Sequence, residues 1–419
     1  MFFAYRVIIY INDIIDNIES EILLFADDTS ILVSGKDTET TSSILNNDLK
    51  KIAEWSIKWK VIFNADKSKQ VIFSRNDIIN SPPIILNNEP IERVSTHKHL
   101  GVTLSQNLDW STHIHNVCLK ANRKLSVLRR VKLLTRATLD VLYKVTVRSV
   151  IDYGLPLFYN SLKITDKARL DKVQYTAGKI VTGALNLTSK HKLDEDLAWE
   201  NIQTRADFLG LSIFHKIATG DTRPFIRSCM PSRNLSDQTR SDGFVHFPYT
   251  KEYHSNSFFP TFTRKYNKIN KEIRNSNITD FKIQLSLQLK PKKRKHYSQG
   301  PKFSNTLLCQ IRVGRSYLKS HSFSIGLAET NTCSCDTTTP ETSLHYFINC
   351  PLFTDARRTL FDQVEQSFIP NFKKISKKRQ LEILLQGFEP ENHEMRKINA
   401  KIIKQTQFFI LKTERFSKP

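Results

Sequence analysis

Short apolar runs alternate with polar turns over the first hundred residues. In "EILLFADDTSILV", residues 22–26 and 31–33 form two apolar runs around a pair of aspartates, which predicts two strands of a hairpin. Further short strands are predicted at "KVIF", "KQVIFS" and "HKHLGVTLS". Asn87 and Asn88 in "PIILNNEPIERV" suit a tight hairpin turn, because asparagine tolerates positive φ.

Between these predicted strands, one segment has the apolar period of a helix. In residues 41–60 the apolar side chains recur at intervals of three and four, which predicts an amphipathic helix covering a sheet; they are Ile44, Leu45, Leu49, Ile52, Trp55 and Trp59. We therefore expect residues 1–105 to form a small antiparallel sheet with one or two helices, and the fold class to be α+β.

From Ser111 the apolar period becomes helical. One apolar stripe contains Ile114, Val117, Cys118, Ala121, Leu125 and Leu128. A second helix is predicted over residues 136–152 and a third from a Thr165 N-cap to a Gly183 C-cap, so residues 106–190 form a helical bundle. Its first helix carries Arg123, Lys124, Arg129, Arg130 and Lys132. These charges indicate either a solvated face or a groove for a nucleic-acid backbone.

Residues 191–300 show a weaker pattern. The stretch "SRNLSDQTRSDGFVHFPYTKEYHSNSFFP" has no clear period and is predicted as an irregular connector. "KPKKRKH" follows, with a basic run of Lys292, Lys293, Arg294 and Lys295. Such a run is typical of a nuclear localisation signal, a phosphate-binding patch or an exposed linker.

Net charge narrows the choice of partner. The chain has 419 residues, enough for two to four domains, and a formal net charge of +22. Such an excess of lysine and arginine predicts a polyanionic partner, most simply nucleic acid. No segment resembles a membrane-spanning helix, and the opening "MFFAYRVIIYI" is too short and carries Arg6. A membrane partner is therefore not expected.

Two groups of residues are candidates for metal chemistry. The first is Asp27 with Asp28, adjacent carboxylates that repel one another unless a cation such as Mg²⁺ lies between them; the alternative is a solvated acidic hairpin tip. The second is a C-x-C-x9-H-x4-C arrangement of Cys333, Cys335, His345 and Cys350. Three thiols and an imidazole are ligands that zinc prefers, and the four-residue interval suits a short helix or turn. The alternative is three unrelated thiols beside a core histidine.

The order of the motifs resembles a known family. "YINDIID", "LLFADDTSILV", "AEWSIKWKVIFNADKSKQVIFS" and "HKHLGVTLSQNLDWSTHI" occur in the order found in reverse transcriptases of non-LTR, LINE-type retrotransposons, most closely the jockey-like group. "VLYKVTVRSVIDYGLPLFYNS", "RLDKVQYTAGKIVTGAL", "QIRVGRSYLKSH" and the Cys/His cluster extend the resemblance over nearly the whole chain. It implies a partial palm over residues 1–105, a helical thumb over 106–190, a connector over 191–300 and a mostly helical C-terminal domain with a zinc-knuckle-like module over 301–419.

The same resemblance implies roles for individual residues. Asp27 would bind the catalytic Mg²⁺ ions with help from Asp28, and Lys67 would protonate the pyrophosphate leaving group. His99, Leu100 and Gly101 fall where the family has its primer-gripping hairpin. The implied partners are an RNA template, a DNA primer or target, and dNTPs, and the implied locations are the cytoplasm and the nucleus.

One departure from the family limits the expected activity. The chain begins directly before "YINDI", whereas the family's other metal-binding aspartate and a Gly-rich block lie further upstream. Asp13 and Asp16 do not replace that aspartate, because they fall in the connection before the hairpin. We therefore expect a fragment of an RNA-directed DNA polymerase that is inactive alone. The alternative is a non-catalytic nucleic-acid-binding remnant or domesticated protein.

Overall fold

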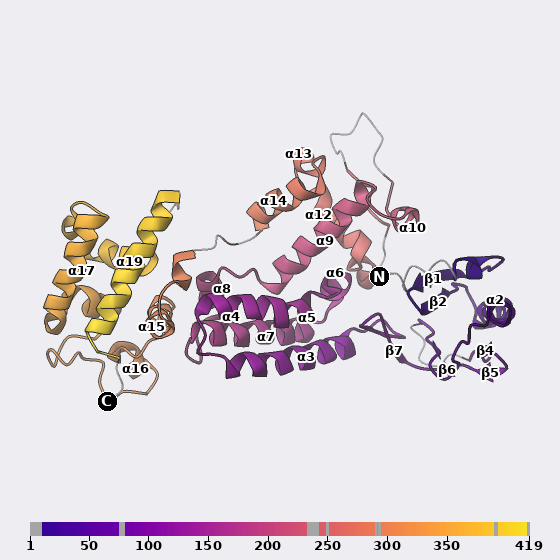
Figure 1. Ribbon diagram of the computed structural model, residues 1–419, viewed down its shortest axis with the longest axis horizontal. Coiled ribbons are helices and arrows are strands. Elements are labelled where there is room, and N and C mark those ends of the chain that lie inside the picture. The colour runs from indigo at the N-terminus through magenta and orange to yellow at the C-terminus, as the bar shows by residue number, and fades with distance from the viewer. Residues whose placement is uncertain are drawn as a thin grey trace. The chain divides into compact units, whose positions relative to one another are not determined.

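The computed structural model describes residues 11–74, 80–232, 243–248, 251–289, 291, 295–388 and 393–416. It is an α+β protein in which helices predominate, as the fold class predicted (Figure 1). Two compact units are present, Met1–His113 and Ile114–Pro419. Within the described ranges, no helix has the length and apolar character needed to cross a bilayer.

The first unit is built on a hairpin and a helix. Strands β1 (Glu21–Phe25) and β2 (Asp28–Leu32) pair antiparallel, with Phe25 opposite Asp28, and follow the short 3-10 helix η1 (Asn12–Ile15). Helix α2 (Thr38–Trp59) begins at an Asp37 N-cap, whose side chain accepts a hydrogen bond from the Thr40 amide. Its predicted apolar face packs on the inner face of the hairpin, and the core contains Ile14, Leu49, Ile52, Ile84 and Leu86.

The other strands of this unit are short. Strands β4 (Ile85–Leu86) and β5 (Glu89–Pro90) enclose Asn87 and Asn88, both at positive φ, so the predicted turn is confirmed. The single strand predicted at 97–105 is instead a second hairpin of β7 (Thr96–His99) and β8 (Val102–Ser105), because Leu100 and Gly101 turn the chain at positive φ. "KQVIFS" contributes only β3 (Lys69–Gln70), parallel to β6 (Glu92–Arg93), and "KVIF" is not a strand.

Helix α3 (Ser111–Arg130) starts where the period changed, and its predicted stripe is buried at Ile114, Val117, Ala121, Leu125 and Leu128. The predicted second helix is continuous from residue 136 to 152, as α4 (Arg136–Leu142), a π-helical turn η2 (Tyr143–Arg148) and α5 (Ser149–Asp152). It lies beside α7 (Ile164–Thr182) (Figure 1). The Gly183 C-cap is confirmed at φ 72°, but the N-cap is Lys163 rather than Thr165, because the helix begins at Ile164.

The predicted connector contains packed helices. The longer ones are α8 (Lys190–Leu197), α9 (Ile202–Ala218), α12 (Phe258–Asn267) and α14 (Ile278–Leu289), and the shorter ones are α10 (Pro224–Ser228), α11 (Glu252–Ser255) and α13 (Lys271–Arg274). The stretch predicted to be irregular, residues 232–260, lies partly outside the described residues, and its described part includes α11 and the start of α12. Earlier in the chain, α6 (Leu155–Phe158) and η3 (Tyr159–Ser161) lie between α5 and α7. Phe214, Phe262 and Phe281 centre a core of their own. Within each helix the core side chains recur at intervals of three and four, as at Leu211, Phe214 and Ala218, so these helices carry a period that the sequence analysis missed.

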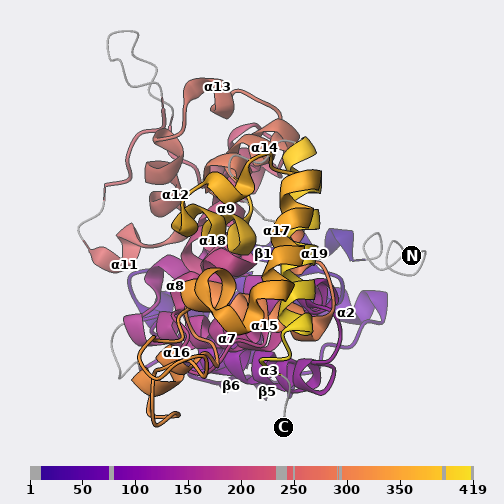
Figure 2. The same ribbon diagram turned by 90° about the vertical axis from the view of Figure 1, so that its left-hand side faces the viewer.

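The C-terminal residues form a further helical lobe. It contains η4 (Lys295–Ser298), α15 (Lys302–Arg312), α16 (Lys319–Ser324), η5 (His345–Asn349), η6 (Pro351–Phe353), α17 (Thr354–Ser367), η7 (Phe372–Lys374), α18 (Lys377–Gln386) and α19 (His393–Lys412). Helix α19 packs against α15, α17 and α18 around Phe347, Phe372, Leu384 and Ile402 (Figure 2). Lys292, Lys293 and Arg294 of the basic run lie outside the described residues, as does the side chain of Lys295.

A buried carboxylate joins α15 to the helices before it. The Asp196 carboxylate lies 2.6 Å from Arg136 Nη1 and 2.6 Å from Arg312 Nε, and all three side chains are almost fully buried. Burial alone raises the pKa of Asp196, but the two guanidinium groups outweigh it and lower this pKa to about 2. The C-terminal lobe is thereby fixed to α4 and α8 through charge as well as apolar contact.

Candidate functional site

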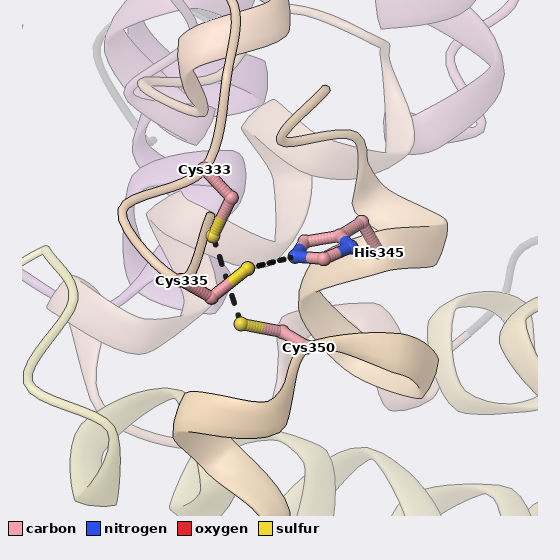
Figure 3. A group of neighbouring side chains, drawn as sticks. All are labelled: Cys333, Cys335, His345 and Cys350. Carbon is pink, nitrogen blue, oxygen red and sulfur yellow. Dashed lines mark hydrogen bonds between the residues drawn. The ribbon is translucent and has the colours of Figure 1, made fainter. Parts of the chain in front are cut away.

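Four predicted ligands converge in the C-terminal lobe. Cys333 Sγ lies 3.6 Å from Cys350 Sγ, and Cys335 Sγ lies 3.2 Å from His345 Nε2 (Figure 3). All four ligand atoms lie within 4.8 Å of one another. Among the described residues, no other group of three or more His, Cys, Asp or Glu side chains is arranged to hold a metal ion.

Local backbone geometry explains this convergence. His345 opens the π-helical turn η5, and the Cys350 amide donates a hydrogen bond to the His345 carbonyl across five residues, at 2.7 Å. A π turn holds about 4.4 residues, so it brings positions five apart to nearly the same face, which an α-helix does not. On the other side, Asp336 accepts hydrogen bonds from the amides of Thr338 and Thr339 and closes the loop that carries Cys333 and Cys335.

The donor set fits a tetrahedral zinc ion. With Zn–S bonds of ~2.3 Å, tetrahedral geometry separates two sulfurs by about 3.8 Å, close to the Cys333–Cys350 separation of 3.6 Å. Cys333 and Cys350 are buried, and burial raises the pKa of the Cys350 thiol. A bound cation would offset that penalty by taking the place of the thiol protons. Four protein ligands leave no open position for substrate, so the chemistry available here is structural.

An ion pair that the sequence did not suggest braces this cluster. Glu341 is 2% exposed and accepts hydrogen bonds from Arg415 Nε and Nη2, each at 2.6 Å. The same carboxylate accepts the Lys319 amide at 2.7 Å. Nearby, the Tyr346 and Thr413 hydroxyls lie 2.6 Å apart. The chain after α19 is thus fastened to the loop that carries the cysteines; Arg415 and Glu341 are 74 residues apart, so no local pattern reveals the pair.

The aspartate pair lies at the bend of the β1–β2 hairpin. Ala26 and Asp27 form the bend, with Ala26 at φ 54°, and Asp28 is already the first residue of β2. The two carboxylates are exposed. An alanine held in the left-handed region carries backbone strain, a feature that clusters at functional sites. Asp27 is therefore the second residue of the two-residue turn, and Asp28 is the first residue of the strand that follows it.

The fit to a two-metal site is incomplete in the described residues. Such a site needs carboxylates from two strands, and Asp27 and Asp28 are not joined by a third ligating side chain within the parts of the chain that the structure describes. Asp13 is engaged elsewhere, accepting a hydrogen bond from Trp55 Nε1 at 2.8 Å. We derive no catalytic step through Mg²⁺ from this arrangement.

The second hairpin lies against the first. His99 Nε2 is 3.3 Å from Ser30 Oγ, which joins β7 to β2. Leu100 and Gly101 form the turn beyond it. Lys67 is exposed in the turn after α2, where its amide donates to Asn64 Oδ1. The structure therefore brings the region of His99 to the aspartate hairpin, and the roles assigned to these residues remain predictions.

Asp48 is a positioning residue that the sequence pattern missed. This fully buried carboxylate of α2 accepts hydrogen bonds from the amides of Glu19 and Ser20, at 3.1 and 2.8 Å, and from Ser20 Oγ at 2.5 Å. Lys51 Nζ lies 3.1 Å away. Because Glu19 and Ser20 directly precede β1, Asp48 fixes where the hairpin begins. An aspartate on the apolar face of an amphipathic helix was the available signal.

The basic residues predicted on α3 are all exposed. Arg123 and Arg130 lie opposite the buried stripe, Lys124 and Arg129 flank it, and Lys132 follows the end of the helix. Val127 lies among them and is 55% exposed. These basic side chains present positive charge to solvent. Their exposure is compatible with a solvated surface and with a surface that binds phosphates.

Comparison with known proteins identifies the relatives of this chain. No protein-family model matches it. It is 28% identical over 189 residues to the RNA-directed DNA polymerase from mobile element jockey of Drosophila melanogaster, a match covering 43% of this chain and 20% of that protein. Its homologues are RNA-directed DNA polymerases of non-LTR retrotransposons.

Two further homologues agree with the jockey match. The probable RNA-directed DNA polymerase from transposon X-element of Drosophila melanogaster is 23% identical, over 43% of this chain and 20% of its own length. The Pol polyprotein from type-1 retrotransposable element R1 of Bradysia coprophila is 24% identical, over 45% of this chain and 20% of its own length. The matched region spans about a fifth of each retrotransposon polymerase.

Proposed function

We propose that this chain is part of a non-LTR retrotransposon RNA-directed DNA polymerase, comprising part of the palm, the thumb and a zinc-binding C-terminal lobe. The observation that carries the proposal is the contact between the "FADD" hairpin and the His99 hairpin, in a chain whose homologues bear that name. Primer-gripping and catalytic hairpins must lie together to bring a primer terminus to the metal ions.

The basic residues of α3 support a role in holding template and primer. These arginines and lysines are spaced along one helix, as is suited to successive phosphates of a duplex. In this proposal α3 belongs to the thumb, and the partners are an RNA template and a DNA primer or target. The zinc ion stabilises the C-terminal lobe and takes no part in phosphoryl transfer.

We propose further that these 419 residues alone bind nucleic acid without extending a primer. Two-metal phosphoryl transfer needs carboxylates on facing strands to hold both ions. Asp27 and Asp28 supply one side of such a site, and the described residues supply no ligand opposite them. Asp27 and Asp28 would then bind Mg²⁺ weakly at most.

Primer extension on a poly(A) template with an oligo(dT) primer, dTTP and Mg²⁺ tests whether the chain binds nucleic acid and whether it extends a primer. Wild-type chain is compared with an Asp27→Ala, Asp28→Ala variant and with an α3 variant carrying Arg123→Gln, Lys124→Gln and Arg130→Gln. Template–primer binding is measured in the same samples. We expect binding without extension, unchanged in the aspartate variant and weakened at least 10-fold in the α3 variant.

Two outcomes contradict the proposal separately. Extension that disappears in the aspartate variant would show a complete polymerase site and would overturn the proposed inactivity. Affinity for a fully paired template–primer duplex that is unchanged by neutralisation of α3 would contradict the thumb assignment.

A further inference from the structure

The last long helix presents a basic face that the sequence patterns did not single out. On α19, the side chains at intervals of four, seven, eleven and fifteen residues from Lys397 fall on one side of the helix and are all exposed; with Lys397 they are Lys401, Lys404, Phe408 and Lys412. The opposite side is buried against α17 and α18 (Figure 2). The helix is therefore held by its apolar face, and its basic face is available to a partner.

The basic face has few acidic neighbours on its own helix. Glu394 lies three residues before Lys397, and no aspartate or glutamate occurs between Lys397 and Lys412. Within the described ranges no ion pair joins these lysines to a carboxylate; Lys401 Nζ lies 5.6 Å from the Phe368 ring, and Lys412 Nζ donates to Thr359 Oγ1 at 3.4 Å. Like charges four residues apart repel one another and destabilise a helix. A bound polyanion would offset this repulsion. Among the residues that the structure describes, no ion pair with a carboxylate of this chain does so.

Phe408 distinguishes the kind of polyanion. Its ring is 53% exposed, between Lys404 and Lys412, and Leu411 beside it is 42% exposed. An exposed aromatic ring among lysines offers a surface on which an unpaired base can stack. A duplex keeps its bases stacked on one another and leaves such a ring unused. From Lys397 to Lys412 the helix rises about 22 Å, enough to follow several nucleotides of a single strand.

We propose that the exposed face of α19 binds single-stranded nucleic acid, with phosphates on Lys397, Lys401 and Lys404 and a base stacked on Phe408. This face is separate from the basic residues of α3, so the inference goes beyond the proposed function and does not depend on it. It assigns the C-terminal lobe a direct contact with the strand, in addition to the structural role of its Cys/His cluster.

Fluorescence anisotropy with the full chain tests this proposal, using a labelled oligouridylate and a labelled hairpin duplex as probes. A Lys397→Gln, Lys401→Gln, Lys404→Gln variant should bind the oligouridylate roughly 10- to 50-fold more weakly, and its slope of log affinity against log salt should fall by about 2, since each phosphate contact on a single strand contributes ~0.7. Phe408→Ala should weaken binding roughly 5- to 100-fold and leave that slope unchanged.

The matched control is a Lys374→Gln, Lys377→Gln, Lys378→Gln variant, which removes the same charge from η7 and α18 of the same lobe. We expect it to retain at least half of the wild-type affinity. Equal losses in the two triple variants would overturn the proposal, because net charge alone would then explain binding.

Other results also decide the question. If only the α3 variant loses oligouridylate binding, the inference about α19 fails while the proposed function stands. If the duplex binds more tightly than the single strand and Phe408→Ala has no effect, the single-strand assignment is wrong. If polyglutamate competes as well as unlabelled oligouridylate, the face suits an acidic protein rather than nucleic acid.

Discussion

His99 Nε2 lies 3.3 Å from Ser30 Oγ, so one hydrogen bond joins two hairpins that are separated by 69 residues in the chain. The contact places the turn at Leu100 and Gly101 on the same side of the unit as the aspartate hairpin. In the described residues the two hairpins belong to separate two-stranded sheets, so this side-chain contact joins them without strand pairing.

A double-mutant cycle on Ser30→Ala and His99→Ala should give a coupling free energy of about 0.5–1.5 kcal/mol, the size of a partly buried hydrogen bond. Urea unfolding of the four proteins, followed by tryptophan fluorescence, measures it. His97→Ala, on the same strand, is the control and should show no coupling to Ser30. A coupling energy near zero would mean that the two hairpins are oriented by other contacts.

Asp48→Asn should lower the free energy of unfolding of the first unit by about 2–3 kcal/mol, because the amides of Glu19 and Ser20 lose a charged acceptor. Asp27→Asn, at an exposed position, should change it by less than about 0.5 kcal/mol. Burial opposes ionisation of Asp48, but hydrogen bonds from Ser20, Glu19 and Lys51 outweigh it and lower its pKa. Its contribution is therefore present above pH ~4 and is lost as pH falls below that value.

Amide hydrogen exchange measures separately whether Asp48 holds the β1–β2 hairpin in place. Amide hydrogen exchange in β1 and β2 should accelerate in Asp48→Asn at pH 7, while exchange in α19 stays unchanged. Unaltered protection of β1 would contradict the positioning role.

Replacing Asp196 by Asn should destabilise the second unit by roughly 3–5 kcal/mol, because Arg136 and Arg312 would remain buried without a counter-charge. Asp171→Asn, which removes a half-exposed partner of Lys190, should cost less than about 1 kcal/mol. Asp196 has a folded pKa of about 2, below its unfolded value of about 3.9. Its stabilisation is complete above pH 4 and disappears between pH 4 and 2, which thermal melts across that range measure. A loss for Asp196→Asn as small as that for Asp171→Asn would show that the clamp is dispensable.

The Cys/His cluster should bind one zinc ion per chain, measured by inductively coupled plasma mass spectrometry after dialysis. Cys333→Ser and His345→Ala should each reduce the zinc content to below about a tenth, whereas Cys229→Ser, at an exposed and separate cysteine, should retain it. Cobalt substitution should give thiolate-to-metal charge-transfer absorption that both ligand variants lose. Full-length chain that carries no zinc when expressed with the metal would refute the assignment.

The Cys/His cluster and α2 show how much of the structure the sequence pattern predicts. Ligand spacing predicted the four residues that the structure brings together, because residue type and short intervals are local properties. Likewise the Asn87–Asn88 turn and the apolar stripes of α2 and α3 follow from local periodicity. The helices around Phe214 and Phe262 were missed, although their core residues recur at intervals of three and four, because the polar stretches between the helices interrupt that period.

Long-range polar contacts were beyond such patterns. Three buried acidic residues have partners far away in the sequence. Asp48 is 28 residues from Ser20, Glu341 is 74 residues from Arg415, and Asp196 is 116 residues from Arg312. The position of Asp48 on the apolar face of α2 was a local signal of burial, whereas nothing in the immediate neighbours of Glu341 and Asp196 separates them from exposed carboxylates. Burial makes each contact important for stability, and burial depends on tertiary packing.

The π turn at His345–Asn349 sets a strict rule for how this lobe can change over generations. Gain or loss of one residue between His345 and Cys350 would rotate one of the four side chains by roughly 80–100° away from the other three, so the cluster would be broken in one step. The loop between Cys335 and His345 is anchored as well, through Asp336 and Glu341. Insertions and deletions in descendants of this chain should therefore be absent between His345 and Cys350.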